Sequence, residues 1–292
     1  SGLISAKKLI NTNYEVLLIE QDSYLGGILK NSNKVKAIDG KNTFEWIKET
    51  EKLIQNSKNI KILKNTLATS YNFTNHLIAL EDKFAGKRID TDKSELTLHK
   101  IRSANIILAN GHIERFLSFR NNDLPGVMLA SAFEKYIHRY GVVPDSNPII
   151  FTNNSSTFSL LKSLVDLGCK PLAYIDYRNN SSIEKKILDF LKNNNIQTYT
   201  SSEIEGCDGT NILKEVSIRD DKKNIIKIKT SMLCVSGGIN PDVHLFTQSK
   251  GLIKWDSKYL TFKPDKPFQN TITLGSASGN FNYQSLNEEV ND

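Results

Sequence analysis

The chain has 292 residues, enough for one large or two medium domains that each bury a core of their own. Its apolar (39%), charged (24%) and aromatic (9%) fractions exclude a fibrous, disordered or collagen-like protein. The net charge of +6 comes from scattered lysines mixed with acidic residues, without the dense basic block that nucleic-acid binders often carry. Because no apolar run reaches the roughly 18 residues that a membrane-spanning helix needs, we expect a cytoplasmic protein that binds neither nucleic acid nor membrane.

The three cysteines, Cys169, Cys207 and Cys234, are far apart and form no C-x-x-C pair. We therefore expect reduced thiols, no dithiol redox centre and no metal site. The chain starts at Ser1, and its first residues already have the pattern of a helix interior. This indicates a fragment that is cut short at both ends.

The first part of the chain alternates predicted helices and strands. Apolar residues at 3.6-residue spacing predict a helix over residues 2–10. The short apolar run 16–19 predicts a buried parallel strand, and Gly26–Gly27 marks the loop after it. A helix over residues 44–54 and a strand over residues 60–63 follow.

The texture then changes to short alternating runs between residues 66 and 102, which predict antiparallel hairpins. The apolar run 106–109 predicts another buried strand, and it leads directly into Asn110–Gly111. A turn at residues 123–126 precedes a predicted helix over residues 129–140. Residues 144–147 are typical of a linker.

A second strand–helix–strand unit follows the linker. Its predicted elements are a strand over 148–151, a helix over 157–167 that stops at Gly168, a strand over 172–176, a helix over 183–193, and strands near Gln197, Val216, Ile226 and Met232. A last strand over residues 271–274 ends at Gly275.

These two similar halves predict an α/β protein with two Rossmann-like βαβ domains, the second inserted in the first. We assign residues 1–118 and 238–292 to a discontinuous dinucleotide-binding domain whose first strand is missing. Residues 119–237 form the inserted second domain.

Gly2 is the only remnant of a G-x-G-x-x-G fingerprint, and we interpret it as the third glycine, which allows close packing of helix and strand. Glu20 then falls at the end of the second strand, where a carboxylate can accept hydrogen bonds from ribose and would repel a 2′-phosphate. This favours NAD or FAD over NADP. The alternative is that Glu20 is only a polar strand end.

Further glycines follow predicted strands, where backbone can pass close to a nucleotide. Gly26 and Gly27 come soon after Glu20, although a plain turn would also explain them. Asn110–Gly111 and Gly275 each follow a buried strand. If these strands belong to one sheet, both exits lie beside one nucleotide at the carboxyl ends of the strands.

The corresponding turn of the second domain contains no glycine. Side chains at Thr152, Asn153 and Asn154 would hold a pyrophosphate away from the backbone, although Asp176 stands where a ribose-binding carboxylate is expected. We predict a degenerate nucleotide fold, with a site for a small polar ligand at these three residues as the alternative to plain packing.

Acid–base candidates are limited to His112, His138 and His244, and none has a partner visible in the sequence. A lone histidine is more often structural than catalytic. We therefore assign no catalytic residue to this chain, because hydride chemistry in such folds is carried by the cofactor.

Several motifs together resemble the alpha subunit of heterotetrameric sarcosine oxidase, and the resemblance runs nearly end to end. They are Ile19-Glu20-Gln21 with Gly26-Gly27, the run from Ala109 to Arg115, the run from Asn121 to Ala130, Phe151-Thr152-Asn153-Asn154, and Val235-Ser236-Gly237-Gly238-Ile239-Asn240-Pro241. The glycine motifs alone would fit the wider glutathione-reductase-like class. Asn110 stands where a threonine is usual, and His112 where a small residue is common, so the cofactor wall could differ.

The resemblance implies oxidation of sarcosine to glycine, with oxygen reduced to hydrogen peroxide and the one-carbon unit passed to tetrahydrofolate. It implies partner beta, gamma and delta subunits, with the amine handled mainly by a partner subunit. NAD would be bound by the first domain, at Gly2, Glu20, Gln21, Gly26, Gly27, Asn110, Gly111 and Gly275, and FMN at the interface with a partner. FAD is the alternative in the first domain. The family's aminomethyltransferase-like domain is absent from this sequence.

Two other interpretations stay open. The chain could be the alpha subunit of a related proline or opine dehydrogenase. It could also be a non-catalytic subunit whose nucleotide only supports the fold.

Overall fold

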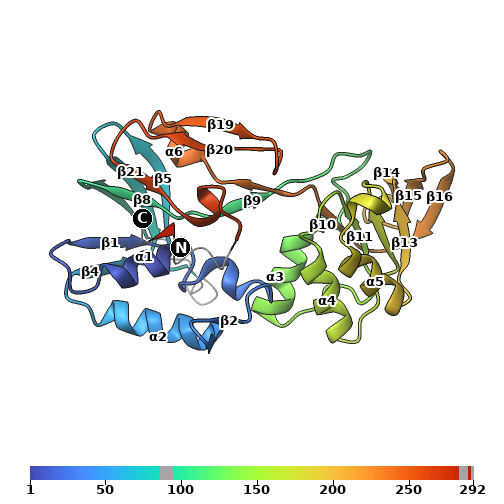
Figure 1. Ribbon diagram of the computed structural model, residues 1–292, viewed down its shortest axis with the longest axis horizontal. Helices are drawn as coiled ribbons and strands as arrows, with labels where there is room; N and C mark the ends of the chain where they lie inside the picture. The colour runs from blue at the N-terminus through green and yellow to red at the C-terminus, as the bar shows by residue number, and fades with distance from the viewer. Residues whose placement is uncertain (86–94, 283–288, 291–292) are drawn as a thin grey trace. The chain divides into compact units, whose positions relative to one another are not determined.

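The computed structural model describes residues 1–85, 95–282 and 289–290. The chain divides into two compact units (Figure 1). Unit 1 comprises Ser1–Gly27, Val35–Ile113 and Asn240–Asp292, and unit 2 comprises Ile28–Lys34 and Glu114–Ile239.

The assignment of two domains stays a prediction, but one part of it differs from the observed units. The segment Ile28–Lys34, which we placed in the first domain, groups with unit 2. Its Ser32 hydroxyl donates a 2.9 Å hydrogen bond to the Glu134 carboxylate, and both side chains are buried. The sequence pattern missed this because segment 28–34 contains no regular apolar repeat.

Unit 1 is built from small sheets and three helices among its described residues. Its helices are α1 (Gly2–Lys8), α2 (Thr43–Gln55) and α6 (His244–Gln248). Its strands are β1 (Val16–Ile19), β2 (Ala37–Ile38), β3 (Lys41–Asn42), β4 (Ile60–Leu63), β5 (Thr66–Asn72), β6 (His76–Asp82), β7 (Leu96–Arg102), β8 (Ile106–Leu108), β19 (Leu252–Asp256), β20 (Thr261–Lys266) and β21 (Thr271–Thr273).

Two parallel pairs form the framework of unit 1. β1 pairs with β4 and β8 pairs with β21. The stretch predicted to contain hairpins forms the antiparallel sheet β5-β6-β7, with residues 86–94 outside the described part. Strands β9 (His112–Glu114) and β18 (Ile239–Pro241), where the chain crosses between the units, also pair with each other.

Apolar side chains cover the β1–β4 pair on one face and β8 on another. Ala6 of α1 and Ile54 of α2 pack with Ile60 of β4, joined by Val16 and Leu18 of β1. A second cluster joins the antiparallel sheet to the β8 strand and α6. Its buried members are Tyr71, Leu77, Leu108 and Phe246, and Ile19 of β1 packs against it.

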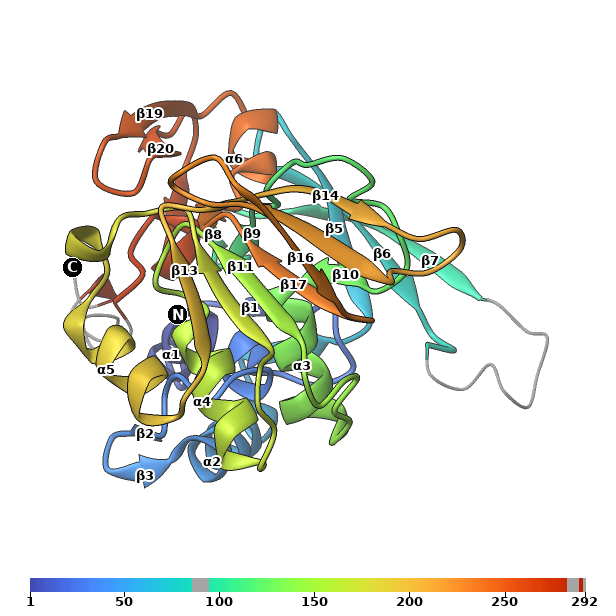
Figure 2. The same cartoon turned by 90° about the vertical axis from the view of Figure 1, so that its right-hand side faces the viewer.

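Unit 2 has an α/β/β layered arrangement, visible in Figure 2. The central parallel sheet has the order β10-β17-β11-β12-β13 and the outer antiparallel sheet the order β14-β15-β16. The helices are α3 (Ala130–Tyr140), α4 (Phe158–Asp166) and α5 (Lys185–Asn193). The strands are β10 (Val127–Leu129), β11 (Ile149–Thr152), β12 (Ala173–Asp176), β13 (Gln197–Thr200), β14 (Glu203–Asp208), β15 (Glu215–Arg219), β16 (Ile225–Lys229) and β17 (Leu233–Ser236).

The central strands of unit 2 are buried on both faces, which explains their continuous apolar runs. Ile150, Tyr174 and Cys234 face a cluster that contains side chains of α3, α4 and α5. Their neighbours Phe151 and Ile175 belong to a second cluster, with residues of β14 and β15. The alternation follows from the two-residue period of a strand.

The observed elements agree with the sequence prediction for most helices and buried strands. Predicted strands 16–19 and 60–63 have the observed bounds, and Gly168 ends α4 with a φ of +74°. Strands β10, β14, β19 and β20 were missed. β10 has only three residues, and in the other three strands charged residues or glycine interrupt the apolar pattern. The predicted helix 2–10 ends earlier, at Lys8.

Candidate nucleotide-binding site

The first part of the candidate site lies where β8 and β21 end. These strands are parallel, and the ladder continues past their last residues through a 3.0 Å hydrogen bond from Leu274 N–H to the Leu108 carbonyl. Asn110–Gly111 and Gly275 therefore leave the same edge of one sheet, as the sequence predicted. The carboxyl edge of a parallel sheet is the usual ligand-binding edge of such folds.

The start of α1 reaches the same edge. The Ser1 hydroxyl donates a 3.4 Å hydrogen bond to the Leu274 carbonyl. A methyl group on Gly2 would lie 3.4 Å from the Ala109 side chain, which is an ordinary contact distance. Helix α1 and the end of β8 therefore lie close together at Gly2, but alanine would also fit there, and the assignment of Gly2 as a fingerprint glycine stays a prediction.

Asn110 and Gly111 connect this edge to the returning chain. The Asn110 side-chain amide donates to the Asp242 carbonyl at 2.8 Å, and Asp242 N–H donates to the Gly111 carbonyl at 3.1 Å. Gly111 has a φ of +90°, and a methyl group there would have no protein atom within 4 Å. Glycine is required by the backbone conformation, and the space beside it is open.

Glu20 stands directly after β1. Its backbone N–H continues the ladder to the Leu63 carbonyl at 2.9 Å. Its carboxylate accepts a 3.0 Å hydrogen bond from Asp22 N–H, which orients the side chain at the strand tip. Glu20 is partly exposed and Gln21 beside it is exposed. Since Ile19 packs against the cluster that contains Leu108, the tips of β1 and β8 adjoin one apolar core.

Gly26 and Gly27 serve the turn that follows. Gly26 has a φ of +116°, and a methyl group on it would lie 3.0 Å from the Ile47 side chain of α2. Gly27 has a φ of +50° and no protein atom within 4 Å of that position. Backbone conformation and packing on α2 account for Gly26, whereas Gly27 also borders open space.

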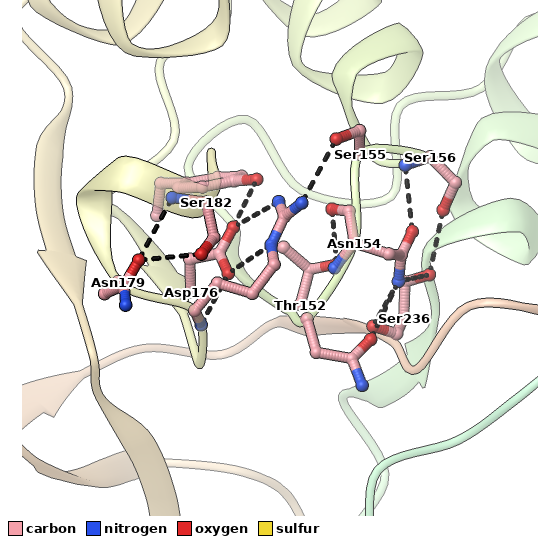
Figure 3. A network of polar contacts seen from close by, with 11 residues as sticks. Thr152, Asn154, Ser155, Ser156, Asp176, Asn179, Ser182 and Ser236 are labelled. Atoms are coloured by element: carbon pink, nitrogen blue, oxygen red, sulfur yellow. Dashed lines mark hydrogen bonds and ion pairs between the residues drawn. The ribbon is translucent and has the colours of Figure 1, made fainter. Parts of the chain in front are cut away.

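The corresponding edge of unit 2 is filled by side chains that bind one another (Figure 3). Thr152, at the end of β11, is fully buried and its hydroxyl accepts a 3.1 Å hydrogen bond from Asn154 N–H. The Asn154 carboxamide accepts from Ser156 N–H at 2.8 Å and donates to the Ser236 carbonyl at 3.1 Å. It also donates to the Asn153 side-chain oxygen. The three residues of the candidate polar-ligand site thus contact one another.

Asp176, at the end of β12, is also bound by a side chain of the same unit. Arg178 Nε and Nη2 donate to its two carboxylate oxygens at 3.0 and 2.8 Å, and Arg178 Nη1 donates to the Ser155 hydroxyl at 3.3 Å. The Asp176 side chain is fully buried. Arg178 therefore joins two loops that would flank a ribose in a working dinucleotide site.

The histidines have structural partners. His138 lies 2.8 Å from the Ser163 hydroxyl, His244 lies 2.7 Å from the Asp242 carboxylate and is exposed, and His112 stacks edge-on against Phe281. The partners that the sequence did not reveal are therefore supplied by the fold.

The three cysteines are free thiols. Burial raises the pKa of Cys207 to about 11, with a contribution from the nearby Asp208 carboxylate. Burial also raises the pKa of Cys234 well above its usual value. Across residues 1–85, 95–282 and 289–290, no group of three or more His, Cys, Asp or Glu side chains is arranged to hold a metal ion. Within those same ranges, no helix is long and apolar enough to cross a bilayer.

Sequence reasoning missed Arg178, Ser236, Asp242 and Glu289. Arg178 and Ser236 each stand at or just beyond the end of a buried strand, which is a usable signal. Asp242 binds Asn110, 132 residues away in the sequence, and Glu289 accepts a 2.9 Å hydrogen bond from Gly275 N–H. The residues around Asp242 and Glu289 give no indication of these contacts.

Solved structures with similar folds include a reductase and a dehydrogenase. Thioredoxin reductase of T. acidophilum matches with a TM-score of 0.68 and 12% identity, over 99% of this chain and 90% of that one. L-proline dehydrogenase of P. horikoshii matches with a TM-score of 0.64 and 19% identity, over 94% of this chain and 48% of that one. The chain has the glutathione-reductase-like fold, and the predicted fold class is confirmed.

Among curated proteins, the chain is similar to sarcosine oxidase subunit alpha. The identity is 28% with the protein of Corynebacterium sp. (strain U-96), over 96% of this chain and 29% of that protein. It is 26% with the protein of Rhizobium meliloti (strain 1021), over 95% of this chain and 27% of that protein. The resemblance drawn from the motifs is confirmed, and the chain spans under a third of the length of these relatives. No family model matches the chain.

Proposed function

We propose that this chain is the cofactor-binding portion of the alpha subunit of a multi-subunit sarcosine oxidase, and that unit 1 binds NAD at the tips of β1, β8 and β21. The observation that carries this proposal is the convergence of Gly2, Asn110–Gly111 and Gly275 at one sheet edge. The curated relatives support the subunit assignment.

The residues present fit a nucleotide. Gly27 and Gly111 border open space, so backbone is accessible to a ligand without side chains in the way. Glu20 offers a carboxylate at the strand tip, which would accept ribose hydroxyls. Gly26, Gln21, Asn110 and Gly275 would shape the wall around it. FAD is the alternative occupant, because it presents the same adenosine and pyrophosphate groups.

In the proposed reaction, sarcosine is oxidised to glycine, its one-carbon unit passes to tetrahydrofolate and oxygen is reduced to hydrogen peroxide. A nicotinamide or flavin nucleotide supplies the hydride and electron transfer when bound. The amine would be oxidised on a flavin of a partner subunit, FMN would be held at the interface with that partner, and beta, gamma and delta subunits would complete the assembly. The described residues of this chain would hold the nucleotide, and the glycines among them would leave its path clear of side chains.

The proposal is tested by titrating the purified chain with NAD and by replacing Glu20. Glu20→Ala is expected to weaken NAD binding by about 1–3 kcal/mol, because buried ribose hydroxyls would lose a charged acceptor. Glu15→Ala is the matched control: Glu15 is exposed at the opposite end of β1. Equal affinity of the Glu20 and Glu15 variants would refute the assignment.

The chain alone is expected to show no peroxide production with sarcosine, because amine oxidation is proposed to occur on a partner. Turnover by the isolated chain would contradict this division of labour. The assay is oxygen consumption, with and without added NAD and FMN.

A proline or opine dehydrogenase alpha subunit is the closest competing function, suggested by the L-proline dehydrogenase of similar fold. Comparing sarcosine and proline as substrates of the intact assembly separates the two. A non-catalytic, nucleotide-bearing subunit is favoured instead if reducing the flavin of that assembly leaves the bound NAD unchanged. The sheet edge of unit 2 is filled by side chains that bind one another, which supports a structural role for unit 2 but not for unit 1.

A further inference from the structure

The loop after β21 surrounds a carboxylate with hydrogen-bond donors. Gly275 N–H donates to Glu289 Oε2 at 2.9 Å, and the Asn280 amide donates to Glu289 Oε2 at 3.1 Å. The Ser278 hydroxyl lies 2.5 Å from Glu289 Oε1 and 2.7 Å from the Gly275 carbonyl, and its single proton is shared between these two acceptors. We call Gly275, Ser278 and Asn280 the anion cradle. Both oxygens of one carboxylate are thus engaged by three donors from a single short loop.

The conformation of that loop aims its donors inward. Gly275 opens a 3-10 turn with a φ of +67°, and its carbonyl accepts hydrogen bonds from Ser278 N–H and Asn280 N–H at 3.0 Å each. These bonds close the loop independently of Glu289. They hold the backbone of the loop in this turn, so the cradle does not depend on Glu289 for its backbone shape.

The cradle lies at the edge where we place the nucleotide. The Ser1 hydroxyl donates to Leu274, directly before Gly275, and Gly2 contacts Ala109 beside Asn110. The carboxylate therefore occupies space beside the candidate cofactor residues.

The chemistry of the cradle selects an anion. All three contacts to the carboxylate come from N–H or O–H donors, and a carboxylate is an acceptor only. A phosphoryl group also presents acceptor oxygens and accepts charge-assisted hydrogen bonds from the same kinds of donor. A metal cation is a poor occupant, because it would face these donors.

We propose that the anion cradle is a binding site for a phosphoryl group, and that Glu289 is an internal occupant that a phosphorylated ligand must displace. The inference rests on the proposed function, since it gives the nucleotide phosphate a place at the same edge. A competing internal group weakens the apparent affinity, because the apparent Kd equals the intrinsic Kd divided by the fraction of molecules in which the site is free.

The test is pyrophosphate binding by the 292-residue chain, measured by calorimetry for the wild type, Glu289→Ala and Glu45→Ala. Glu289→Ala is expected to tighten pyrophosphate binding by about tenfold, as for a site that is free in roughly one molecule in ten. Glu45→Ala removes the same charge from an exposed position on α2 and should change little. Adding Ser278→Ala to Glu289→Ala should reverse the gain, because a donor is lost.

Two outcomes overturn the inference: unchanged or weaker pyrophosphate binding by Glu289→Ala, or an equal gain in Glu45→Ala, which would indicate only a change in net charge. Glu289→Gln, which retains the shape, should give a smaller gain and covers the case of an unstable alanine variant.

NAD is titrated in parallel. If wild type binds NAD while Glu289→Ala alters neither ligand, the cradle inference fails and the proposed function stands. If no variant binds NAD, the proposed function fails independently of the pyrophosphate result.

Discussion

The two parallel-sheet edges of this molecule use the same βαβ architecture in opposite ways. In unit 1 the strands β8 and β21 open onto Gly111 and Gly275, both with positive φ. The backbone beside Gly111 borders open space, whereas Gly275 is buried and its N–H donates to Glu289. In unit 2 the strands β11 and β12 open onto Thr152 and Asp176, which are fully buried and bonded to neighbouring side chains. The same architecture can therefore leave one sheet edge open to a ligand and fill the other with its own side chains.

The largest expected effect tests whether the unit 2 edge is structural. Asp176→Ala should lower the free energy of unfolding of unit 2 by about 3 kcal/mol, because it leaves the mostly buried Arg178 guanidinium without its carboxylate. Hydrogen exchange of the β11 and β12 amides measures this. Both tryptophans, Trp46 and Trp255, lie in unit 1, so their fluorescence reports that unit separately.

Asp189→Ala serves as the control for that measurement, since Asp189 is exposed on α5 of the same unit. A change within about 0.5 kcal/mol is expected for it. If Asp176→Ala instead leaves the stability of unit 2 intact and alters binding of NAD, the comparison of the two edges is reversed.

A second prediction concerns the open edge of unit 1. Gly111→Ala and Gly40→Ala both place a side chain at a positive φ, +90° and +73°, and neither methyl group would contact protein within 4 Å. Each should cost about 1–2 kcal/mol of stability through the backbone. Only Gly111→Ala should also weaken NAD binding, by roughly tenfold, because its methyl group would crowd the ligand. The measurement is a parallel NAD titration of the two variants. Equal losses of NAD affinity would argue against a nucleotide at this edge.

The smallest expected effect is the alkaline sensitivity of unit 2. Burial raises the pKa of Cys207 to about 11, so the folded state keeps the thiol proton more firmly than the unfolded state does. The resulting stabilisation is complete below the ordinary thiol pKa of 9.0 and is lost as pH rises toward about 11. Urea unfolding between pH 8 and 10.5 should show falling stability. Cys207→Ala should reduce this slope and leave the part that comes from the buried Cys234 thiol, whereas Cys169→Ala should leave the slope unchanged. A slope that is identical in all three proteins would show that Cys207 does not contribute.

Much of the fold was predictable because it rests on local pattern. The buried strands 16–19 and 60–63 and the helix around residues 43–55 are specified by apolar spacing, since one or both of their faces must be buried. Strands β19 and β20 escaped prediction because Trp255 and Phe262 are half exposed and pair with each other. Their apolar side chains face neither a helix nor a continuous sheet, so no period appears in the sequence.

The sequence by itself determined that backbone glycines follow the strands of unit 1 and that polar side chains follow those of unit 2. It could do so because glycine's freedom at positive φ and the size of a side chain are properties of single residues. Only the tertiary structure decided that Arg178 binds the Asp176 carboxylate and that Glu289 occupies the anion cradle. Both depend on where a side chain points after folding, which no single residue or local pattern specifies.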